Sequence, residues 1–385
     1  MSSLSDPHAA VVGTGFVAVV HVDALRRLGV EVTGVVGSSP ERAAEKALAT
    51  GLPQPYPSFE AMLDDDRVDV VHITSPNRFH AEQAKAVLAA GKHCVCEKPL
   101  AMDSGETAEM LAAAQASGLV HATNFNLRFY PQVQEARARI RDGELGAVRL
   151  VTGGYLQDWL LLDTDWNWRL DPSEGGELRA VGDIGSHWID MVGFITGLRV
   201  EEVIADLVTF VPVRRRPRGP VETFGGGRPK GETVEQPMTS EDAAGFMLRL
   251  ESGARAVAAV SQVSAGRRNN LHFEVDGSRR ALAWDQERPE ELWLGHRGRA
   301  NEVLLRDPAL LSPDAAAATA LPAGHAEGYA DTFRELYRRV YEAVAAGGPP
   351  AEPDYPTFAA GHEQAVVGEA LAASAREGRW LRPKR

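Results

Sequence analysis

The first third of the chain alternates short apolar segments with alanine-rich helical segments, and this alternation constrains the fold more than any other feature. The segment "AAVVGTGF" predicts a strand that runs into a glycine turn, and "VVHVDALRRLG" predicts the helix after it. The pairing repeats until "LVHATNFN", which ends the series as a strand. Because strands linked by helices in this way run parallel, we predict a doubly wound α/β sheet with helices on both faces.

The pattern changes after about residue 127. The segment 128–146 predicts one long helix closed by Gly146. Beyond it, strand-like runs flanked by glycine are typical of a mainly antiparallel sheet, and two helices follow near the end. Since 385 residues exceed the usual size of one core, we predict two domains, 1–126 and 127–385, with the last helix packing back on the first domain.

The interval 212–242 contains "RPRGP" and "FGGGRPKGE" and shows no periodicity. We predict an exposed loop, long enough to act as a lid or an oligomer arm. Its basic run, 214–219, is interpreted as part of a solvated loop rather than as a nucleic-acid patch.

Charge and cysteine content narrow the range of partners. A net charge of -12 argues against nucleic-acid and anionic-membrane partners, which require a basic face. The two cysteines cannot build a disulfide framework, which favours a reducing compartment. The sequence shows neither a signal peptide nor an apolar run of transmembrane length. We therefore expect a cytoplasmic protein.

Two glycines directly follow the first predicted strand. Gly13 permits a tight turn, Gly15 lets backbone amides approach a pyrophosphate, and the small Ala18 lets the helix pack closely on the strand. An ordinary glycine turn is the alternative, but the position at the first strand–helix junction favours a dinucleotide site. We expect the contacts to come from Gly13, Gly15, Phe16 and Val17.

The end of the second predicted strand carries no acidic residue to bind the ribose of NAD. Ser38, Ser39 and Arg42 stand there instead, and this set is suited to the 2′-phosphate of NADP. Alternatively, Ser39 caps the helix that begins at Pro40, and both roles are compatible. We infer NAD or NADP, with no support for strict NAD selectivity.

The third predicted strand ends in "TSPNRFH", again on the ligand-binding edge of a doubly wound sheet. We expect Ser75, Pro76 and Asn77 to carry the chain across the cofactor. His80 is interpreted as a helix-start residue near the phosphates rather than as a catalyst.

The segment "GKHCVCEKPLAMD" ends the fourth predicted strand. Cys94 and Cys96 point to the same face, and without a second Cys/His cluster they are interpreted as buried packing residues rather than as a metal or redox site. Lys98 follows the strand on the same edge as the glycine turn, and Pro99 bends the chain there. We predict that Lys98 faces the nicotinamide end of a dinucleotide, the alternative being a solvated lysine.

Asp183 and His187 stand four residues apart where a helical pattern begins. Residues i and i+4 share a helix face, so the carboxylate is expected to orient the imidazole and stabilise its protonated form. Such a pair is the acid/base couple that an alcohol oxidation requires. The alternative reading has Asp183 as a helix cap and His187 as a packing residue.

The segment 155–172 is rich in tryptophan and polar side chains. Aromatic faces beside hydrogen-bonding groups suit a carbohydrate, although core or interface packing explains such tryptophans as well. The candidate substrate residues here are Tyr155, Asp165, Trp166 and Arg169. His325, before a late helix, is a further candidate for the pocket.

Four segments together resemble the Gfo/Idh/MocA family of NAD(P)-dependent oxidoreductases: "GTGFVA", "SPNRFHAEQAKAVLAAGKHCVCEKPLA", "NFNLRFYPQVQEARARIRDGELG" and "DIGSHWID". The resemblance implies a Rossmann domain followed by an α/β domain with a large open, mostly antiparallel sheet. It assigns catalysis to Lys98, Asp183 and His187, places Glu97 by the nicotinamide ribose, and places Arg128 near the pocket. It also implies a homodimer or homotetramer. The missing acid after the second strand departs from the family pattern.

The predicted function is therefore oxidation of a secondary ring hydroxyl of a sugar, glycoside or inositol-type polyol by hydride transfer to NAD(P). His187 is the expected general base, with Lys98 as the alternative base. A reductase of a keto-sugar or another carbonyl is the second hypothesis. A non-catalytic dinucleotide-binding regulator is the third, and it would not require these two residues together with Asp183.

Overall fold

The computed structural model describes residues 6–219 and 231–385. Its first sheet has six strands in the order β3-β2-β1-β4-β5-β6, and every neighbouring pair is parallel. Because β1 lies between β2 and β4, the strand order reverses beside β1. Sheets of this kind bind ligands at the carboxyl ends of the strands that flank such a reversal. The strands are β1 (Ala9–Val12), β2 (Val32–Val36), β3 (Gln54–Tyr56), β4 (Val70–Ile73), β5 (His93–Cys96) and β6 (His121–Thr123).

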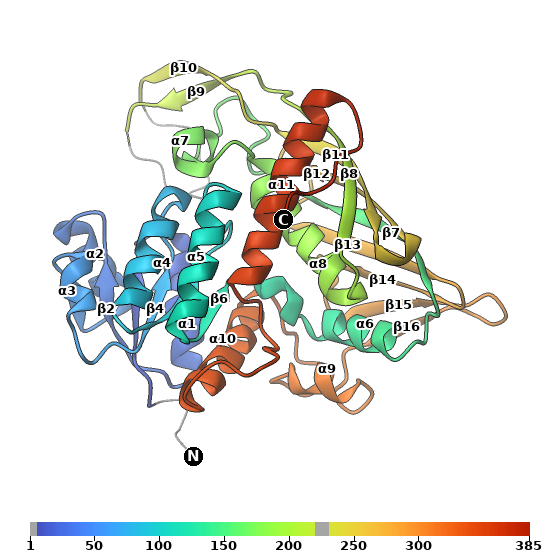
Figure 1. The fold of residues 1–385 in the computed structure, drawn as a ribbon, viewed down its shortest axis with the longest axis horizontal. Helices are drawn as coiled ribbons and strands as arrows, with labels where there is room; N and C mark the ends of the chain where they lie inside the picture. Colours follow the sequence, from blue (N-terminus) through green and yellow to red (C-terminus); the bar gives the residue numbers. More distant parts are fainter. Residues whose placement is uncertain (1–5, 220–230) are drawn as a thin grey trace.

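Helices cover both faces of this sheet, as Figure 1 shows in blue and teal. The strands are almost entirely buried, which explains their continuous apolar sequences. The predicted doubly wound parallel sheet is confirmed. Its helices are α1 (Phe16–Arg27), α2 (Pro40–Thr50), α3 (Phe59–Leu63), α4 (His80–Ala89) and α5 (Ser104–Ser117).

The second sheet has eight strands in the order β16-β15-β14-β13-β7-β12-β11-β8. Only the β12–β7 pair is parallel among its described pairings, so the predicted open, mostly antiparallel sheet is confirmed. Helices α6 (Pro131–Arg141) and α8 (Ser186–Thr196) pack on one face and share its apolar core. The strands are β7 (Val148–Leu156), β8 (Val200–Val208), β11 (Ala243–Leu250), β12 (Arg255–Ser261), β13 (Asn270–Gly277), β14 (Ala281–Asp285), β15 (Glu291–Gly295) and β16 (Glu302–Leu305).

The two late helices connect the sheets. Helix α10 (Tyr329–Ala345) packs on α1 and completes the core on one face of the parallel sheet. Helix α11 (Phe358–Glu377) contacts α5 and β6 on one side and β8 and α8 on the other, and it stands between the two sheets in Figure 1. The domain boundary at residues 126 and 127 stays a prediction.

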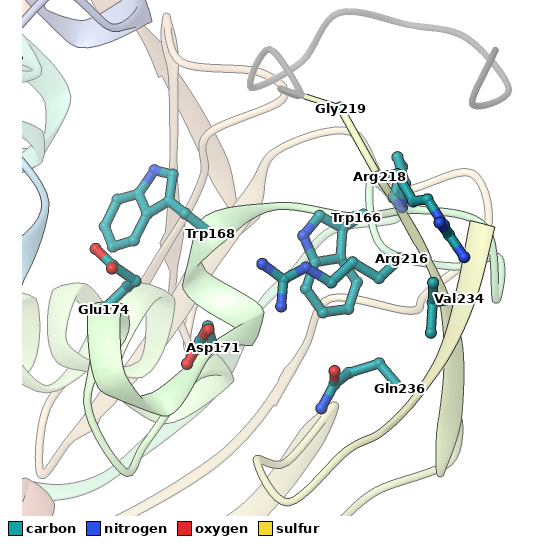
Figure 2. A pocket seen from close by; sticks show the side chains of 10 residues that line it. Trp166, Trp168, Asp171, Glu174, Arg216, Arg218, Gly219, Val234 and Gln236 are labelled. Carbon is teal, nitrogen blue, oxygen red and sulfur yellow. The ribbon is translucent and has the colours of Figure 1, made fainter. Parts of the chain in front are cut away.

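The expectation of an irregular loop over 212–242 is wrong in its described part. Strands β9 (Val213–Pro217) and β10 (Thr233–Pro237) pair as an antiparallel hairpin that lies over the segment 166–174 (Figure 2). Arg214, in the basic run, is fully buried, and its guanidinium donates 2.7 Å to Oδ1 of Asp242. The negative charge of Asp242, which is distant in sequence, compensates the cost of burying the guanidinium. The hairpin tip, 220–230, lies outside the described residues.

The helix expected over 128–146 is shorter than predicted. A 3₁₀ turn, Asn126–Phe129, precedes α6, which starts at Pro131 and ends at Arg141. Proline at the first helical position fixes this start, because it lacks the N–H that a helix interior needs. Within the described part of the chain, no helix has the length and apolarity to cross a membrane.

Candidate active site

The glycine turn after β1 packs against the end of β4 and has no space for a side chain at Gly13. Gly13 has a φ of +118°, and a Cβ atom there would lie 2.7 Å from the backbone oxygen of Thr74, so a side chain is excluded. Gly15 is the N-cap residue of α1 and brings no side chain to that helix end. A helix N-terminus of this kind binds anions well. The turn and the first residues of α1, Phe16 and Val17, therefore fit a dinucleotide pyrophosphate.

The residues after β2 are open to a ribose. Ser39 caps α2, and its Oγ accepts a hydrogen bond of 3.4 Å from the backbone N of Arg42, so the capping alternative holds. The side chains of Ser38 and Arg42 are exposed and remain accessible to a ribose or its phosphate. The segment directly after β2, Gly37 to Pro40, contains no carboxylate that would select NAD over NADP.

The turn after β4 is tied to both halves of the chain. Nδ2 of Asn77 donates a hydrogen bond of 2.9 Å to the oxygen of Gly175. The ring nitrogens of the buried His80 lie 2.9 Å from the oxygen of Pro99 and 2.8 Å from that of Ser75. His80 thus holds this turn against the bend that follows Lys98. The predicted cofactor residues on the turn itself are Ser75, Pro76 and Asn77.

Cys94 and Cys96 are fully buried free thiols of β5. Burial raises the pKa of both, so neither is a ready thiolate. Among the described residues, no cluster of histidine, cysteine and acidic side chains has the arrangement of a metal site. Both cysteines act as packing residues between the sheet and its helices.

A buried chain of polar groups lies directly beneath the bend. Nε2 of His21, on α1, lies 3.0 Å from Oε1 of Glu97, and its Nδ1 lies 3.0 Å from Nδ1 of His72, on β4. Nε2 of His72 lies 3.1 Å from the hydroxyl of Tyr341, on α10. Nδ2 of Asn124 donates a second hydrogen bond to Oε1 of Glu97. The carboxylate beside Lys98 is therefore held from α1, β6 and α10 together.

Glu97 is the charged end of this chain. Burial alone would raise its pKa, but the hydrogen bond and charge of His21, followed by the charge on Lys98 and the hydrogen bond from Asn124, lower it. An ionised carboxylate only accepts, so Nε2 of His21 donates to it. Burial and then the charge of His21 lower the pKa of His72 well below 6.5, so His72 is neutral and contacts His21 and Tyr341 through its two ring nitrogens.

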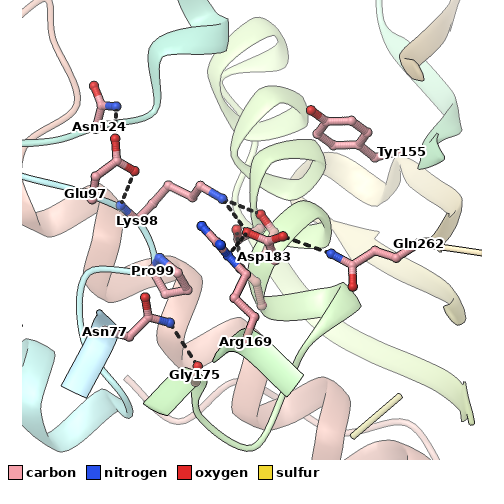
Figure 3. Close-up of polar contacts among 12 residues, drawn as sticks. Asn77, Glu97, Lys98, Pro99, Asn124, Tyr155, Arg169, Gly175, Asp183 and Gln262 are labelled. Atoms are coloured by element: carbon pink, nitrogen blue, oxygen red, sulfur yellow. Dashed lines mark hydrogen bonds and ion pairs between the residues drawn. The ribbon is translucent and has the colours of Figure 1, made fainter. Parts of the chain in front are cut away.

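Lys98, just after β5, contacts Asp183, in the turn that leads into α8 (Figure 3). Nζ of Lys98 donates 2.8 Å to Oδ1 and 2.7 Å to the backbone oxygen of Asp183. Nε of Arg169 lies 3.3 Å from the same Oδ1, and Nε2 of Gln262 donates 2.9 Å to Oδ2. Burial would raise the pKa of Asp183, but the charges on Lys98 and Arg169 outweigh it and hold this pKa below its ordinary value. The aspartate is an anion held from three sides.

His187 lies one helical turn further, on α8, and is 7% exposed. Its ring packs at 5.7 Å from the ring of Phe125 and at 6.1 Å from that of Tyr155. Burial and then the positive charge on Lys98 lower its pKa well below 6.5, against the opposing effect of Asp183. The imidazole is therefore neutral at neutral pH, as a proton acceptor must be.

The structure departs from the expected Asp183–His187 hydrogen bond. Among the described residues, the carboxylate binds Lys98, Arg169 and Gln262, and no hydrogen bond joins it to the imidazole. The reason is local, since Asp183 lies in a π-helical turn, Val181–Gly185, whose wider winding shifts i and i+4 out of line. Asp183 influences His187 only through its charge.

Three predicted site residues lie elsewhere. Arg128 directs Nε to Oδ2 of the buried Asp190 at 2.7 Å, so its guanidinium fixes α8 rather than the pocket. Asp165 accepts a hydrogen bond of 2.7 Å from the backbone N of Leu162 and shapes its own loop. His325 is exposed in the segment before α10, with its Nδ1 3.3 Å from the oxygen of Ala323.

Comparison with known proteins gives a consistent result over both sheets. The family model described as "Oxidoreductase family, NAD-binding Rossmann fold" matches residues 8–125, and that of the GFO/IDH/MocA C-terminal domain matches residues 133–283. The chain belongs to the Gfo/Idh/MocA family of oxidoreductases.

Individual members of the family agree in sequence and in fold. Levoglucosan dehydrogenase of Pseudarthrobacter phenanthrenivorans is 31% identical over 353 residues, covering 90% of this chain and 88% of that protein. The apo structure of a levoglucosan dehydrogenase superposes with a TM-score of 0.89 at 29% identity, over the full length of both chains. An inositol dehydrogenase homologue from Azotobacter vinelandii, solved with NAD+, has a TM-score of 0.84 at 27% identity over 98% of each chain.

As a Gfo/Idh/MocA oxidoreductase, the chain uses an NAD(P) cofactor in its Rossmann domain. Several groups at the site escaped sequence reasoning, namely His21, Asn124, Gln262 and Tyr329. Tyr329 opens α10, and its ring lies 5.1 Å from that of Phe333. The one available sequence signal was "HVDAL" in the helix after the glycine turn, where a histidine falls on the buried face.

Proposed function

We propose that this oxidoreductase oxidises a secondary ring hydroxyl of a sugar, glycoside or inositol-type polyol. The observation that carries the proposal is the convergence of Lys98, Asp183 and a neutral His187 beside the carboxyl edge of the parallel sheet. Relatives named as levoglucosan and scyllo-inositol dehydrogenases support this substrate class.

Each residue has a distinct part in the reaction. The nicotinamide, when bound, accepts the hydride from the carbinol carbon. His187 takes the hydroxyl proton, because its depressed pKa keeps it neutral and its ring is available. Lys98 is paired with Asp183, and its Nζ donates to the substrate oxygen and stabilises alkoxide character rather than acting as the base. Release of one hydride and one proton leaves the ketone.

The bound cofactor is proposed to be either NAD or NADP. The glycine turn and α1 fit the pyrophosphate, and the exposed Ser38 and Arg42 leave the ribose end open to both forms. Structures of related chains contain NADH or NAD+, whereas a D-xylose dehydrogenase of Haloferax volcanii, 33% identical over 43% of this chain, is named for NADP+.

Reduction of a keto-sugar is the second candidate. A 1,5-anhydro-D-fructose reductase of Ensifer adhaerens is 35% identical over 48% of this chain. The same residues serve both directions, with His187 returning the proton. A non-catalytic regulator is disfavoured, since dinucleotide binding alone does not require an ion-paired lysine and aspartate beside a neutral histidine.

The test incubates the purified chain with NAD+ or NADP+ and a panel of sugars and inositols, and with reduced cofactor and keto-sugars, while the absorbance of the reduced cofactor is followed. We expect turnover in at least one direction, absent in Lys98→Ala. Dinucleotide binding without turnover in either direction would exclude the enzyme and favour the regulator.

We further propose a cytoplasmic homodimer or homotetramer that uses the outer face of the large sheet. Met247 and Val257 are 41% and 37% exposed there, on the strands β11 and β12. Light scattering after size exclusion tests the assembly, and a monomer at micromolar concentration would contradict it.

A further inference from the structure

A pocket whose lining includes neither Lys98 nor Asp183 lies between the segment 166–174 and the β9–β10 hairpin (Figure 2). We call it the outer pocket. Its cavity volume is about 630 Å³, within the range of small-molecule sites. The side chains that matter for its chemistry are Trp166, Trp168, Asp171, Glu174, Arg216 and Gln236.

The outer pocket combines aromatic faces with polar groups that have spare hydrogen-bonding capacity. Trp166 is half-buried, and the guanidinium carbon of Arg216 lies 5.4 Å from the centre of its ring. Arg216 has no ion pair among the described residues, and in Figure 2 its guanidinium points into the pocket. Within the part of the chain that the structure describes, the side chain of Gln236 makes only a long hydrogen bond of 3.5 Å, from Nε2 to the oxygen of Pro237. These groups remain available to a ligand.

The acidic side chains of the outer pocket are already engaged. A carboxylate oxygen of Glu174 lies 3.0 Å from Nε of Arg78, and Oδ1 of Asp171 accepts hydrogen bonds from both the backbone N and Oγ of Ser173. Their negative charges balance the positive charge of Arg216, but neither carboxylate forms an ion pair with its guanidinium. A pocket with near-neutral charge, an indole wall and free donors suits a ligand with many hydroxyls and no charge of its own.

Only one side chain separates the outer pocket from the catalytic aspartate. The guanidinium of Arg169 stacks on the Trp168 ring at 4.4 Å, and its Nε lies 3.3 Å from Oδ1 of Asp183. Trp168 lines the outer pocket. Arg169 therefore links the outer pocket to Asp183.

We propose that the outer pocket is a sugar subsite that holds the non-reacting ring of a glycoside while the other ring lies at Lys98 and His187. This inference rests on the proposed function and narrows its substrate to two-ring sugars. The ring stacks a C–H face on Trp166, and its hydroxyls bind Arg216 and Gln236.

The test measures binding and turnover separately on the full chain. Cellobiose, maltose and lactose are compared with glucose by isothermal titration calorimetry and by steady-state kinetics, in the wild type, Trp166→Ala and Arg216→Ala. The matched control is Arg215→Ala, since Arg215 is the exposed neighbour that pairs with Asp163 at 2.7 Å instead of lining the pocket. We expect both pocket variants to weaken binding of at least one two-ring sugar and raise its KM by about tenfold or more, with glucose and the control within about twofold.

The outcomes separate the two proposals. Arg216-dependent binding of a two-ring sugar without any turnover supports the outer pocket and contradicts the proposed enzyme function. Turnover of one-ring sugars with no Arg216-dependent binding of any two-ring sugar overturns the outer pocket and leaves the enzyme function standing. An equal loss for glucose and two-ring sugars in Arg216→Ala also overturns it, because a distal subsite does not contact a single ring.

Discussion

Nζ of Lys98 lies 2.8 Å from Oδ1 of Asp183, and this ion pair joins the lip of the parallel sheet to the turn that leads into α8. The pair leaves His187, one turn away, without a hydrogen-bonded partner among the described residues. The proposed division of roles rests on this arrangement, with Lys98 polarising the substrate oxygen and His187 accepting the proton.

Replacing Lys98 with alanine should abolish most turnover without abolishing cofactor binding. We expect kcat to fall by at least about 100-fold, because the charge that stabilises the developing alkoxide is lost. Dinucleotide affinity, measured by fluorescence titration, should stay within several-fold. Lys85→Ala is the control, since this lysine pairs with Glu109 on the surface. A kcat near that of the wild type would refute the role of Lys98.

The pH profile of oxidation should reflect the neutral state of His187. Because its pKa is lowered well below 6.5, the imidazole remains deprotonated at and above that pH. We expect kcat/KM to show no acid limb from this group between about pH 6.5 and 8, and His187→Asn to lower it by about 100-fold or more. An acid limb in this range that disappears in His187→Asn would contradict the lowered pKa.

The buried chain beneath Glu97 should matter for cofactor binding. His21→Leu removes the only histidine donor to Glu97, so we expect weaker dinucleotide binding and a loss of about 1–3 kcal/mol in the free energy of unfolding. Tyr341→Phe, the matched variant, removes only the hydroxyl that contacts His72, further from the carboxylate, and should cost less. Chemical denaturation and fluorescence titration measure both effects. Equal losses in the two variants would contradict the larger role of the contact between His21 and Glu97.

Coenzyme preference should respond to a carboxylate after β2. Ser38→Asp places a negative charge where the ribose is expected, so NADP+ affinity should fall by about tenfold or more while NAD+ affinity is retained. Ser117→Asp adds the same charge at the exposed last residue of α5, at the opposite edge of the sheet, and should leave the ratio unchanged. If Ser38→Asp leaves the NADP+ to NAD+ affinity ratio unaltered, this strand end does not read the ribose.

Stability should decline as the pH falls below 6.5. A histidine whose pKa is lower in the folded state binds its proton preferentially in the unfolded state, so acid favours unfolding from 6.5 down to the folded pKa, which for His121 is about 4. Each such group contributes up to about 1.4 kcal/mol per pH unit. Urea denaturation between about pH 7.5 and 5 measures the slope; a flat profile would contradict these shifts. The histidines concerned are His72, His80, His93, His121 and His187.

The sequence predicted elements whose signals are local. Gly13 has a positive φ, as the predicted glycine turn requires. The apolar runs form the strands of the parallel sheet, and Lys98 follows directly after one of them, β5. Sequence spacing failed where winding or distant partners decide. Asp183 lies in a π-helical turn and does not make the expected contact with His187. Arg214, predicted to lie in a solvated loop, is buried and donates a hydrogen bond to Asp242.

Partners from distant segments explain the remaining differences. Gln262, just after β12, donates a hydrogen bond to Asp183, and Arg128 pairs with Asp190 on α8. The sequence separation of the residues in these pairs does not indicate either contact. Polar residues that converge only in the folded chain leave no periodic trace. The same reason hid the contact between His21 and His72.

The position of α10 sets a condition on how this protein is made. Phe333, Tyr337 and Val340 complete the apolar core on one face of the parallel sheet, and Tyr341 closes the polar chain below Glu97. The ribosome therefore presents the sheet and its glycine turn long before the helix that covers them has been synthesised. An apolar surface stays open throughout that interval, and such a surface is prone to aggregation until α10 covers it.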